Sequence, residues 1–189
     1  MNTSKIKVFI GITLDGYIAR KNDSLDWLFE LPNPKGIDHG YFQFLSGIDT
    51  VIIGRKTYEE DLKYAKLNMG GKWADGNNRI YVMTTHENYA PQSDNTEIIK
   101  QLDRKAIDKI RAESQKDIYV VGGGQIISEL LNLGAIDEMI LCIFPIIIGS
   151  GIQLFPDAPK ETKFDLVKAE PFETGAVTLT YKLKTELSH

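Results

Sequence analysis

The stretch IYVVGGGQ, residues 118–125, decides the fold that we expect for this chain. Its first four residues are apolar and mostly β-branched, which is typical of a strand covered on both faces. The glycines at 122–124 predict a sharp turn, and the apolar spacing of residues 125–133, which ends before Gly134, predicts a helix. A buried strand that turns directly into a helix is the building unit of α/β proteins with a parallel sheet.

Similar segments recur along the whole chain. Short apolar runs bounded by turn residues predict further strands at residues 6–12, 50–53, 79–84 and 139–144. The helical spacing of apolar residues predicts helices at residues 38–45 and 103–112. This alternation of strands and helices predicts an α/β fold, with a mainly parallel central sheet and helices on both of its faces.

The C-terminal part of the sequence has a different pattern. Residues 164–172 and 176–183 are strand-like runs joined by a short turn, which predicts an antiparallel hairpin at the edge of the sheet. Alternate residues of the second run are expected to face inward, namely Val177, Leu179, Tyr181 and Leu183. The Gly- and Asn-containing stretch 63–78 is expected to be a surface loop. Because no repeat or linker composition divides the chain, we expect one domain over residues 1–189.

The composition restricts the classes of function. The chain has a net charge of −4 and no block of Lys or Arg, so we expect no nucleic-acid or membrane-surface partner. The polar N-terminus and the short apolar runs predict neither a secretion signal nor a membrane span. The only cysteine, Cys142, leaves no disulfide, zinc or redox motif, so we expect a reducing, cytoplasmic location and no metal. A small-molecule ligand is the remaining expectation.

Residues that can bind an anion follow three of the predicted strands. The glycines at 122–124 would let backbone N–H groups approach a diphosphate at the start of a helix, unless they form only a tight turn. Residues 54–57, Gly-Arg-Lys-Thr, add two cations and a hydroxyl, although such cations are more often solvated. Residues 84–86 add two hydroxyls and an imidazole. Because the carboxyl ends of parallel strands meet at one edge, these segments predict a shared dinucleotide groove.

Five motifs follow one another in a specific order. They are TLDGYIA (13–19), GRKTYE (54–59), TTH (84–86), VVGGG (120–124) and PIIIGSGI (145–152). The set resembles the dihydrofolate reductase superfamily, and is most like the branch that contains the C-terminal reductase domain of bifunctional riboflavin-biosynthesis deaminase/reductases. The resemblance implies a three-layer, dihydrofolate-reductase-like fold. The sequence contains no deaminase zinc motif, so we expect a stand-alone member of that branch.

The resemblance implies NADPH as the cofactor. Members of the superfamily bind it across the carboxyl edge of the sheet, where one Gly–Gly peptide is cis. The positions that match the cofactor contacts are Gly54, Arg55, Lys56, Thr57, Thr84, Thr85, His86, Gly122, Gly123 and Gly124. Arg55 is the preferred phosphate contact, because a guanidinium can bind a phosphate through two parallel hydrogen bonds.

The resemblance also implies a substrate side of the site. Asp38 matches the acidic residue that holds a pterin ring and helps to deliver a proton, and the same helix supplies Phe42; alternatively, Asp38 only caps that helix. Cys142 matches the hydroxyl partner of this acid, or is a packing thiol. Asp15 lies in the loop beside the nicotinamide and is a second candidate for catalysis. Trp27 either walls the substrate pocket or packs in the core.

Together these residues predict an NADPH-dependent oxidoreductase. Hydride would pass to a C=N or C=O bond of a pterin-like or pyrimidine-like molecule, as in dihydrofolate reductase or 5-amino-6-(5-phosphoribosylamino)uracil reductase. The alternative is a non-catalytic NADP(H)-binding module with a degenerate substrate site, because Phe9 replaces a lysine that the riboflavin branch often carries and Cys142 replaces a hydroxyl. The resemblance further implies a homodimer joined through the C-terminal strands.

Overall fold

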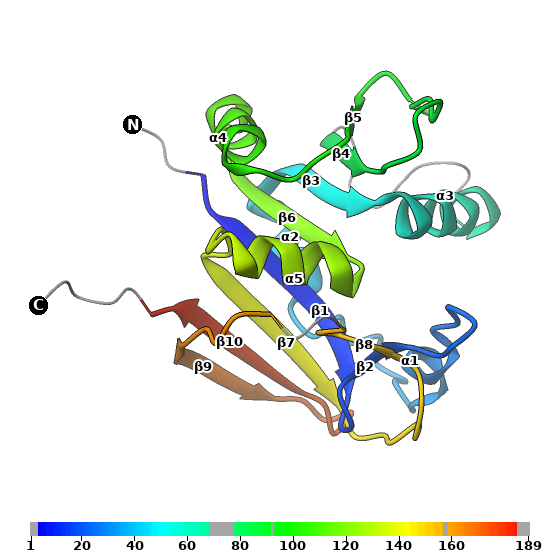
Figure 1. Cartoon of the computed structure of the whole chain (residues 1–189). Helices are drawn as coiled ribbons and strands as arrows, with labels where there is room; N and C mark the ends of the chain where they lie inside the picture. The colour runs from blue at the N-terminus through cyan, green and yellow to red at the C-terminus, as the bar shows by residue number, and fades with distance from the viewer. Residues whose placement is uncertain (1–3, 69–77, 92, 157–158, 185–189) are drawn as a thin grey trace, which may run out of the picture.

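The computed structural model describes residues 4–68, 78–91, 93–156 and 159–184. Its main feature is an eight-stranded sheet in the order β5-β4-β3-β6-β1-β7-β10-β9 (Figure 1). The strands from β5 to β7 run parallel, whereas β10 pairs antiparallel with both β7 and β9. The predicted mixed sheet with an antiparallel C-terminal hairpin is therefore confirmed.

The strands of the large sheet lie close to their predicted positions. Their bounds are β1 (Ile6–Thr13), β3 (Ile48–Gly54), β4 (Arg79–Met83), β5 (Thr96–Ile99), β6 (Asp117–Gly122), β7 (Glu138–Phe144), β9 (Phe164–Pro171) and β10 (Val177–Leu183). A separate two-stranded sheet joins β2 (Tyr17–Ala19) to β8 (Ile152–Gln153). Strands β2, β5 and β8 are short and are not among the predicted strands.

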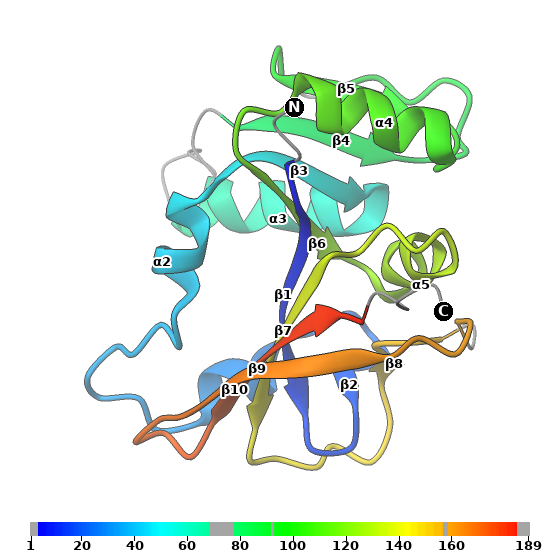
Figure 2. The same ribbon diagram turned by 90° about the vertical axis from the view of Figure 1, so that its left-hand side faces the viewer.

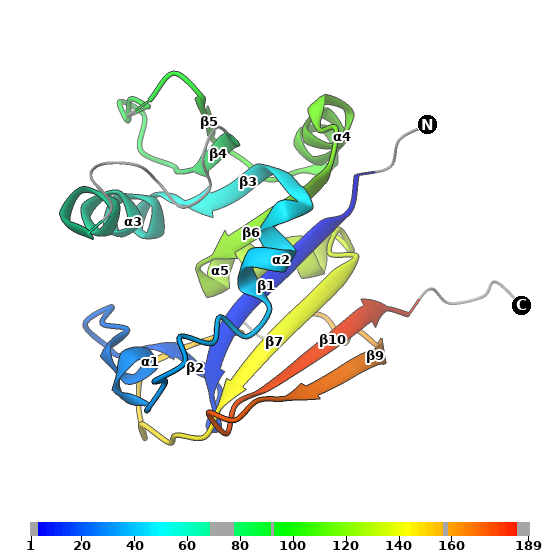
Figure 3. The ribbon, with the colours of Figure 1, turned by 180° about the vertical axis from the view of Figure 1, so that it is seen from behind.

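Helices cover both faces of the sheet, which gives the three predicted layers (Figures 1 and 3). The described helices are α1 (Asp26–Glu30), α2 (Tyr41–Ser46), α3 (Arg55–Asn68), α4 (Arg104–Glu113) and α5 (Gly124–Asn132). On one face, α4 and α5 bury Ile107 and Leu130. On the other face, α1 and α3 bury Trp27 and Tyr58. Across the described residues, no helix is long and apolar enough to cross a lipid bilayer.

The central strands supply two separate cores because their side chains alternate between the two faces of the sheet. In β1, Val8 packs on the side of α4 and α5, whereas its neighbour Phe9 packs on the side of α1, α2 and α3. In β3, Ile52 and Val51 divide in the same way. This double coverage is the reason that these strands have consecutive apolar residues rather than an alternating pattern.

The segment after β3 differs from the prediction. Residues 63–68 were expected in a surface loop, but they continue α3, so that prediction is wrong for this part; positions 69–77 lie outside the described residues. The helix contains Glu, Lys, Leu and Ala, which favour helical backbone, and ion pairs such as Arg55–Glu59 and Lys63–Glu60 connect successive turns. The cations and the hydroxyl of residues 55–57 therefore belong to the first turn of a helix.

β10 is covered on both faces. The four residues expected to face inward are all partly buried, and Thr178, which points to the opposite face, is only 7% exposed. Thr178 pairs with Cys142 of β7 in the antiparallel ladder. β10 thus extends the core, whereas most residues of β9 are exposed. The turn between them comes close to the segment before α2 (Figure 2).

Candidate functional site

The carboxyl ends of β3 and β6 meet at the edge of the sheet. Ile53 of β3 is in register with Gly122 of β6. A Cβ atom built on Gly54 would lie 3.6 Å from the Gly122 carbonyl oxygen, and one built on Gly123 would lie 3.9 Å from Thr57 Oγ1. The structure therefore brings together the first glycine of one motif, the hydroxyl residue that follows it, and the glycine turn.

The three glycines of this turn differ in their surroundings. Gly122 has φ +126°, a conformation that favours glycine, and its peptide bond to Gly123 is cis. A Cβ atom on Gly124 would lie 2.7 Å from the carbonyl oxygens of both Gln153 and Leu154. Gly124 is thus required for the close packing of α5 against β8, whereas the surface over Gly122 and Gly123 is open among the described residues.

The end of β4 lies beside this edge. Thr84 is buried, and its hydroxyl accepts a hydrogen bond from the His86 N–H at 3.2 Å, while Thr85 and His86 are exposed. The Lys100 ammonium, which follows β5, donates to the carbonyl oxygens of His86 and Glu87. Lys100 is therefore a further cation at this corner. It was missed because β5 is too short to stand out in the sequence.

Arg55 is oriented toward the same corner. Its Nη1 donates to Glu59 Oε2 at 2.8 Å, and its guanidinium carbon lies 6.0 Å from the centre of the Tyr89 ring. The Tyr89 N–H donates to the His86 carbonyl, so the turn after β4 brings this ring close to the helix start. The Arg55 side chain is 23% exposed, and Lys56 beside it is fully on the surface. Ends of three strands thus contribute cations, hydroxyls and open glycine backbone to one region.

Asp15 connects two loops of the chain. Thr13 Oγ1 donates to its carboxylate at 2.6 Å, and the Gly149 N–H donates to it at 2.8 Å. These hydrogen bonds, the one from Thr13 above all, lower the pKa of Asp15. The carboxylate is therefore ionised at neutral pH and ties the turn between β1 and β2 to the segment after β7. This geometry favours an anchor over a proton donor.

Asp38 lies three residues before Tyr41, the first residue of α2, because the helix begins later than predicted. Its carboxylate accepts hydrogen bonds from the Phe42 N–H at 2.8 Å and the Gly40 N–H at 3.1 Å, and these bonds lower its pKa. The capping alternative therefore has direct geometric support. A carboxylate has further lone pairs, so the cap does not prevent a ligand contact. The Phe42 ring beside it is 69% exposed.

His39 is a buried residue that the sequence did not single out. Its ring lies between Phe144 and Phe172, with centroids 5.1 and 5.0 Å away, and its Nε2 is 2.8 Å from Thr174 Oγ1. Burial lowers the pKa of the imidazole, so it is neutral at physiological pH. The only signal in the sequence was its position directly after Asp38.

Cys142 is linked to this group through Thr178. The thiol is 2% exposed, and burial raises its pKa, so it is a protonated thiol at neutral pH. The Thr178 hydroxyl donates to the His39 carbonyl oxygen at 3.3 Å and also contacts the thiol. The two residues predicted to act as a pair, Asp38 and Cys142, are thus joined by two intermediates rather than by a direct contact in the described structure.

Comparison with known proteins assigns the chain to a family. Residues 4–178 match the model of the RibD C-terminal domain. The chain belongs to the RibD C-terminal domain family. YwjB, an uncharacterized protein of Bacillus subtilis (strain 168), is 33% identical to this RibD C-terminal domain over 178 residues, which are 94% of this chain and 97% of YwjB.

Solved structures have the same fold as this RibD C-terminal domain. A protein of Shewanella sp. PV-4, named for riboflavin biosynthesis, is 29% identical with a TM-score of 0.82, and the match covers 96% of this chain and 99% of that protein. Dihydrofolate reductase from Enterococcus faecalis, in complex with NADP(H) and RAB-propyl, is 16% identical with a TM-score of 0.67, over 97% and 98% of the two chains. The second similarity shows the dihydrofolate-reductase-like fold alone.

Position 9, where the riboflavin branch often carries a lysine, lies in an aromatic environment in this RibD C-terminal domain. Phe9 occupies it, and its ring packs against Tyr41 and Phe44 of α2 with centroid distances of 5.4 and 5.1 Å. Trp27 is 1% exposed and lies edge-on to Phe144 at 5.7 Å, so the packing alternative describes its position. Its indole N–H has no hydrogen-bond partner among the described residues.

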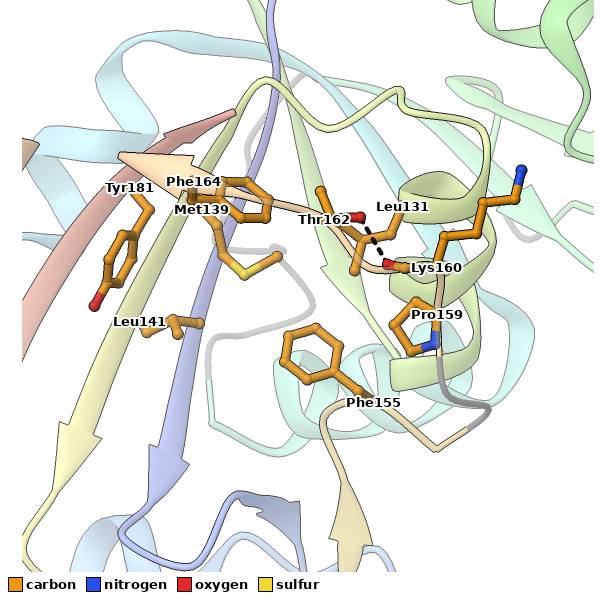
Figure 4. A pocket seen from close by; sticks show the side chains of 9 residues that line it. All are labelled: Leu131, Met139, Leu141, Phe155, Pro159, Lys160, Thr162, Phe164 and Tyr181. Atoms are coloured by element: carbon orange, nitrogen blue, oxygen red, sulfur yellow. Dashed lines mark hydrogen bonds between the residues drawn. The ribbon is translucent and has the colours of Figure 1, made fainter. Parts of the chain in front are cut away.

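A cavity of about 330 Å³ lies on the α5 side of this RibD C-terminal domain (Figure 4). It is lined by Leu131, Met139, Leu141, Phe155, Pro159, Lys160, Thr162, Phe164 and Tyr181. None of these residues belongs to the strand-end corner, so the cavity is separate from the candidate site. In the parts of the chain that the structure describes, no group of three His, Cys, Asp or Glu side chains could hold a metal ion.

Proposed function

We propose that this protein is an NADPH-dependent reductase that transfers hydride to a pterin-like or pyrimidine-like molecule. The observation that carries the proposal is the meeting of Gly54 and Thr57 with the Gly122–Gly123 turn, next to the oriented guanidinium of Arg55. Membership in the RibD C-terminal domain family supports the same reaction class. The NADP(H) bound to the Enterococcus faecalis reductase, which has the same fold, supports the choice of cofactor.

The residues at the sheet edge fit a dinucleotide. The open backbone over Gly122 and Gly123 would accommodate the diphosphate, because a side chain at either position would occupy that space. Arg55, Lys56 and Lys100 would hold the 2′-phosphate of NADPH, which carries the additional negative charge that distinguishes it from NADH. The cofactor, when bound, supplies the hydride.

The protein's own contribution would be orientation and the exclusion of water. Asp38 is ionised at neutral pH, so its carboxylate would accept hydrogen bonds from N–H groups of a heterocyclic substrate. The exposed ring of Phe42 would pack against the flat face of such a substrate. Asp15 would hold the turn after β1 against the segment after β7.

Two measurements test this proposal. The first is a thermal-shift titration with NADPH and NADH, because a ligand that binds only the folded state raises the unfolding temperature. We expect a saturable shift that is larger for NADPH. The second is NADPH oxidation in the presence of dihydrofolate, a dihydropterin or 5-amino-6-(5-phosphoribosylamino)uracil. Absence of saturable NADPH binding would overturn the proposal.

A specific observation favours one other function, a non-catalytic NADP(H)-binding module. Phe9 is packed into an aromatic cluster where a substrate-binding lysine was expected, and the Cys142 thiol already has Thr178 as its partner. These features support a substrate side that lacks the expected polar contacts, beside a strand edge that has cations and glycines. Turnover of any compound in the substrate panel would reject this alternative.

We also propose that the protein forms a homodimer through its C-terminal strands. β9 is an edge strand of the sheet, and its Leu166 and Val167 are 56% and 52% exposed. Exposed apolar side chains on an edge strand are typical of a surface that another chain covers. Analytical ultracentrifugation should give twice the monomer mass, and the substitution Leu166→Lys should give the monomer. A monomer in the unmodified protein contradicts the proposal.

A cytoplasmic location, a small-molecule substrate, and the absence of nucleic-acid and membrane partners stay predictions from the sequence. The assignment of residues 1–189 to one domain is a prediction of the same kind.

A further inference from the structure

We propose that Thr174, in the turn between β9 and β10, positions the Asp38 carboxylate by holding the imidazole of His39. The inference rests on the proposed function in one respect, which is that Asp38 binds the substrate. Thr174 lies 135 residues after His39 in the sequence, but its hydroxyl is 2.8 Å from Nε2 of the imidazole. Thr174 would therefore act as a positioning residue that does not itself contact the substrate.

The backbone of His39 needs an external support. Its φ angle is +55°, which places a non-glycine residue in the left-handed region. Such a conformation is uncommon for a residue with a side chain, although histidine adopts it more readily than most, and it costs free energy that the surroundings must offset. Because His39 directly follows Asp38, a change in its backbone would also change the direction of the Asp38 side chain.

The surroundings hold His39 from three sides. Its ring is packed edge-on between Phe144 at the end of β7 and Phe172 at the end of the hairpin. Its carbonyl oxygen accepts a hydrogen bond from Thr178 Oγ1 of β10 at 3.3 Å. The Thr174 hydroxyl completes the set through its hydrogen bond with Nε2 of the ring. The hairpin therefore supplies both polar contacts of this residue.

The Asp38 carboxylate depends on the same local geometry. It accepts hydrogen bonds from the N–H groups of Gly40 and Phe42, which lie on the other side of His39 in the sequence. These bonds require the chain to reverse direction at His39 and Gly40, both of which have positive φ angles. Loss of the Thr174 contact would leave a buried ring nitrogen without a partner and would allow the reversal to relax.

Charged groups near His39 do not provide the same support. Lys35 forms an ion pair with Glu173, which connects the same segment to the same turn. Both side chains are well exposed, at 65% and 69%, so this pair contributes little to the position of the backbone. Asp38 itself is the other charged neighbour of the imidazole. The ion pair therefore offers a matched control, because it connects the same two segments through the solvent-exposed side.

The first test needs no substrate. Amide hydrogen exchange of Gly40 and Phe42 reports the two hydrogen bonds to Asp38, and we compare Thr174→Val, Thr174→Ser and Glu173→Gln with the unmodified protein. We expect Thr174→Val to increase both exchange rates about tenfold, which is the net loss of one hydrogen bond, and the other two variants to change them less than about twofold. Unchanged exchange at Val8 and Ile52 in the central strands shows that the fold is intact.

The outcomes of this test are distinct. Equal exchange in Thr174→Val and the unmodified protein overturns the proposal, and so does an equal increase in Glu173→Gln. If Thr174→Val does not fold, Thr174→Ala takes its place. Alanine removes the same hydroxyl without putting a methyl group in its position, and the result is judged by the same criteria. If Thr174→Ser behaves as Thr174→Val does, the hydroxyl is not the group that matters.

The second test uses whichever compound of the substrate panel is turned over. We expect Thr174→Val to raise KM for that compound about five- to tenfold, with a smaller change in kcat and an unchanged Kd for NADPH, and we expect Thr174→Ser to restore KM. An equal loss of affinity for substrate and NADPH contradicts a role specific to Asp38. If no compound is turned over, the proposed function fails, while the exchange measurement still decides the role of Thr174.

Discussion

The guanidinium of Arg55 lies over the ring of Tyr89, with 6.0 Å between the guanidinium carbon and the ring centre. The two residues belong to α3 and to the turn after β4, so their contact connects two of the strand ends that form the candidate cofactor site. Together with Glu59, the ring limits the orientations open to the guanidinium before any ligand binds. If Arg55 binds a cofactor phosphate as proposed, it would therefore lose little side-chain freedom on binding.

Arg55→Ala should weaken the binding of NADPH selectively. Hydrogen bonds to charged groups contribute about 1.5–3 kcal/mol, so we expect the Kd of NADPH to rise roughly 10- to 150-fold. The Kd of NADH should change less than about threefold if Arg55 contacts the 2′-phosphate. Isothermal titration calorimetry measures both values. Lys160→Ala, which removes a cation beside the separate cavity, is the control and should leave both values unchanged. Equal losses for the two cofactors contradict this role of Arg55.

Gly124→Ala should destabilise the fold. The added Cβ atom would lie 2.7 Å from two carbonyl oxygens of β8 and the residue after it, which are backbone atoms and cannot rotate away. We expect a loss of about 1–3 kcal/mol in the free energy of unfolding, measured by urea denaturation. Gly47→Ala is a matched control, since its φ of −90° is open to alanine and its nearest contact is 3.5 Å away. That control should stay within about 0.5 kcal/mol of the unmodified protein.

Asp15→Asn should change how stability depends on pH. Because the folded state lowers the pKa of Asp15, the carboxylate stabilises the protein at neutral pH, and this contribution is lost as the pH falls through the folded-state pKa, below about pH 4. We therefore expect Asp15→Asn to unfold at a lower temperature than the unmodified protein at pH 7, with a difference that shrinks below about pH 4. Thermal unfolding followed by circular dichroism measures this difference.

The matching control for Asp15 is Asp165→Asn. Asp165 is an exposed carboxylate of β9 with a loose ion pair to Lys184 at 3.6 Å. Its substitution should not alter the unfolding temperature at any pH in this range. A difference between Asp15→Asn and the unmodified protein that stays constant down to pH 2 would mean that the charge of Asp15 is not what stabilises the two loops.

Cys142 should be inert toward thiol reagents in the folded protein. Its burial both raises the thiol pKa and blocks access, so reaction requires local opening of β7 or β10. We expect the rate of reaction with a disulfide reagent to rise at least roughly 100-fold in denaturant. The sequence contains one cysteine, so the signal has a single source. Rapid reaction under native conditions would exclude the packing-thiol interpretation.

The features that could be predicted from the sequence are those with local causes. The strand-turn-helix unit at 118–133 follows from consecutive apolar residues, glycines and helical spacing, and β6 and α5 occupy that stretch. α3 was partly mistaken for a loop because its polar composition carries no strong apolar stripe, although its ion pairs one turn apart were visible in the sequence. Local secondary structure was predicted correctly where the hydrophobic pattern and the turn residues agreed.

The features that could not be predicted depend on residues far apart in the chain. Asp15 was expected at the reacting centre, but its partner Gly149 lies 134 residues away and gives it an anchoring geometry. His39 was not singled out, because nothing in the sequence brings Thr174 to its ring. Lys100 lies at the candidate cofactor site only because β5 is paired with β4. These contacts arise from the order of the strands in the sheet, so no periodic pattern in the sequence indicates them.

The packing of Phe9 against Tyr41 and Phe44 restricts which side chains position 9 can accept. Phe9 is 8% exposed, so a lysine introduced there would carry its charge into a space shaped for a ring. A lysine at position 9 would therefore require accompanying changes in the two partner rings on α2. The aromatic cluster of Phe9, Tyr41 and Phe44 therefore makes this position of β1 an apolar one in the folded protein.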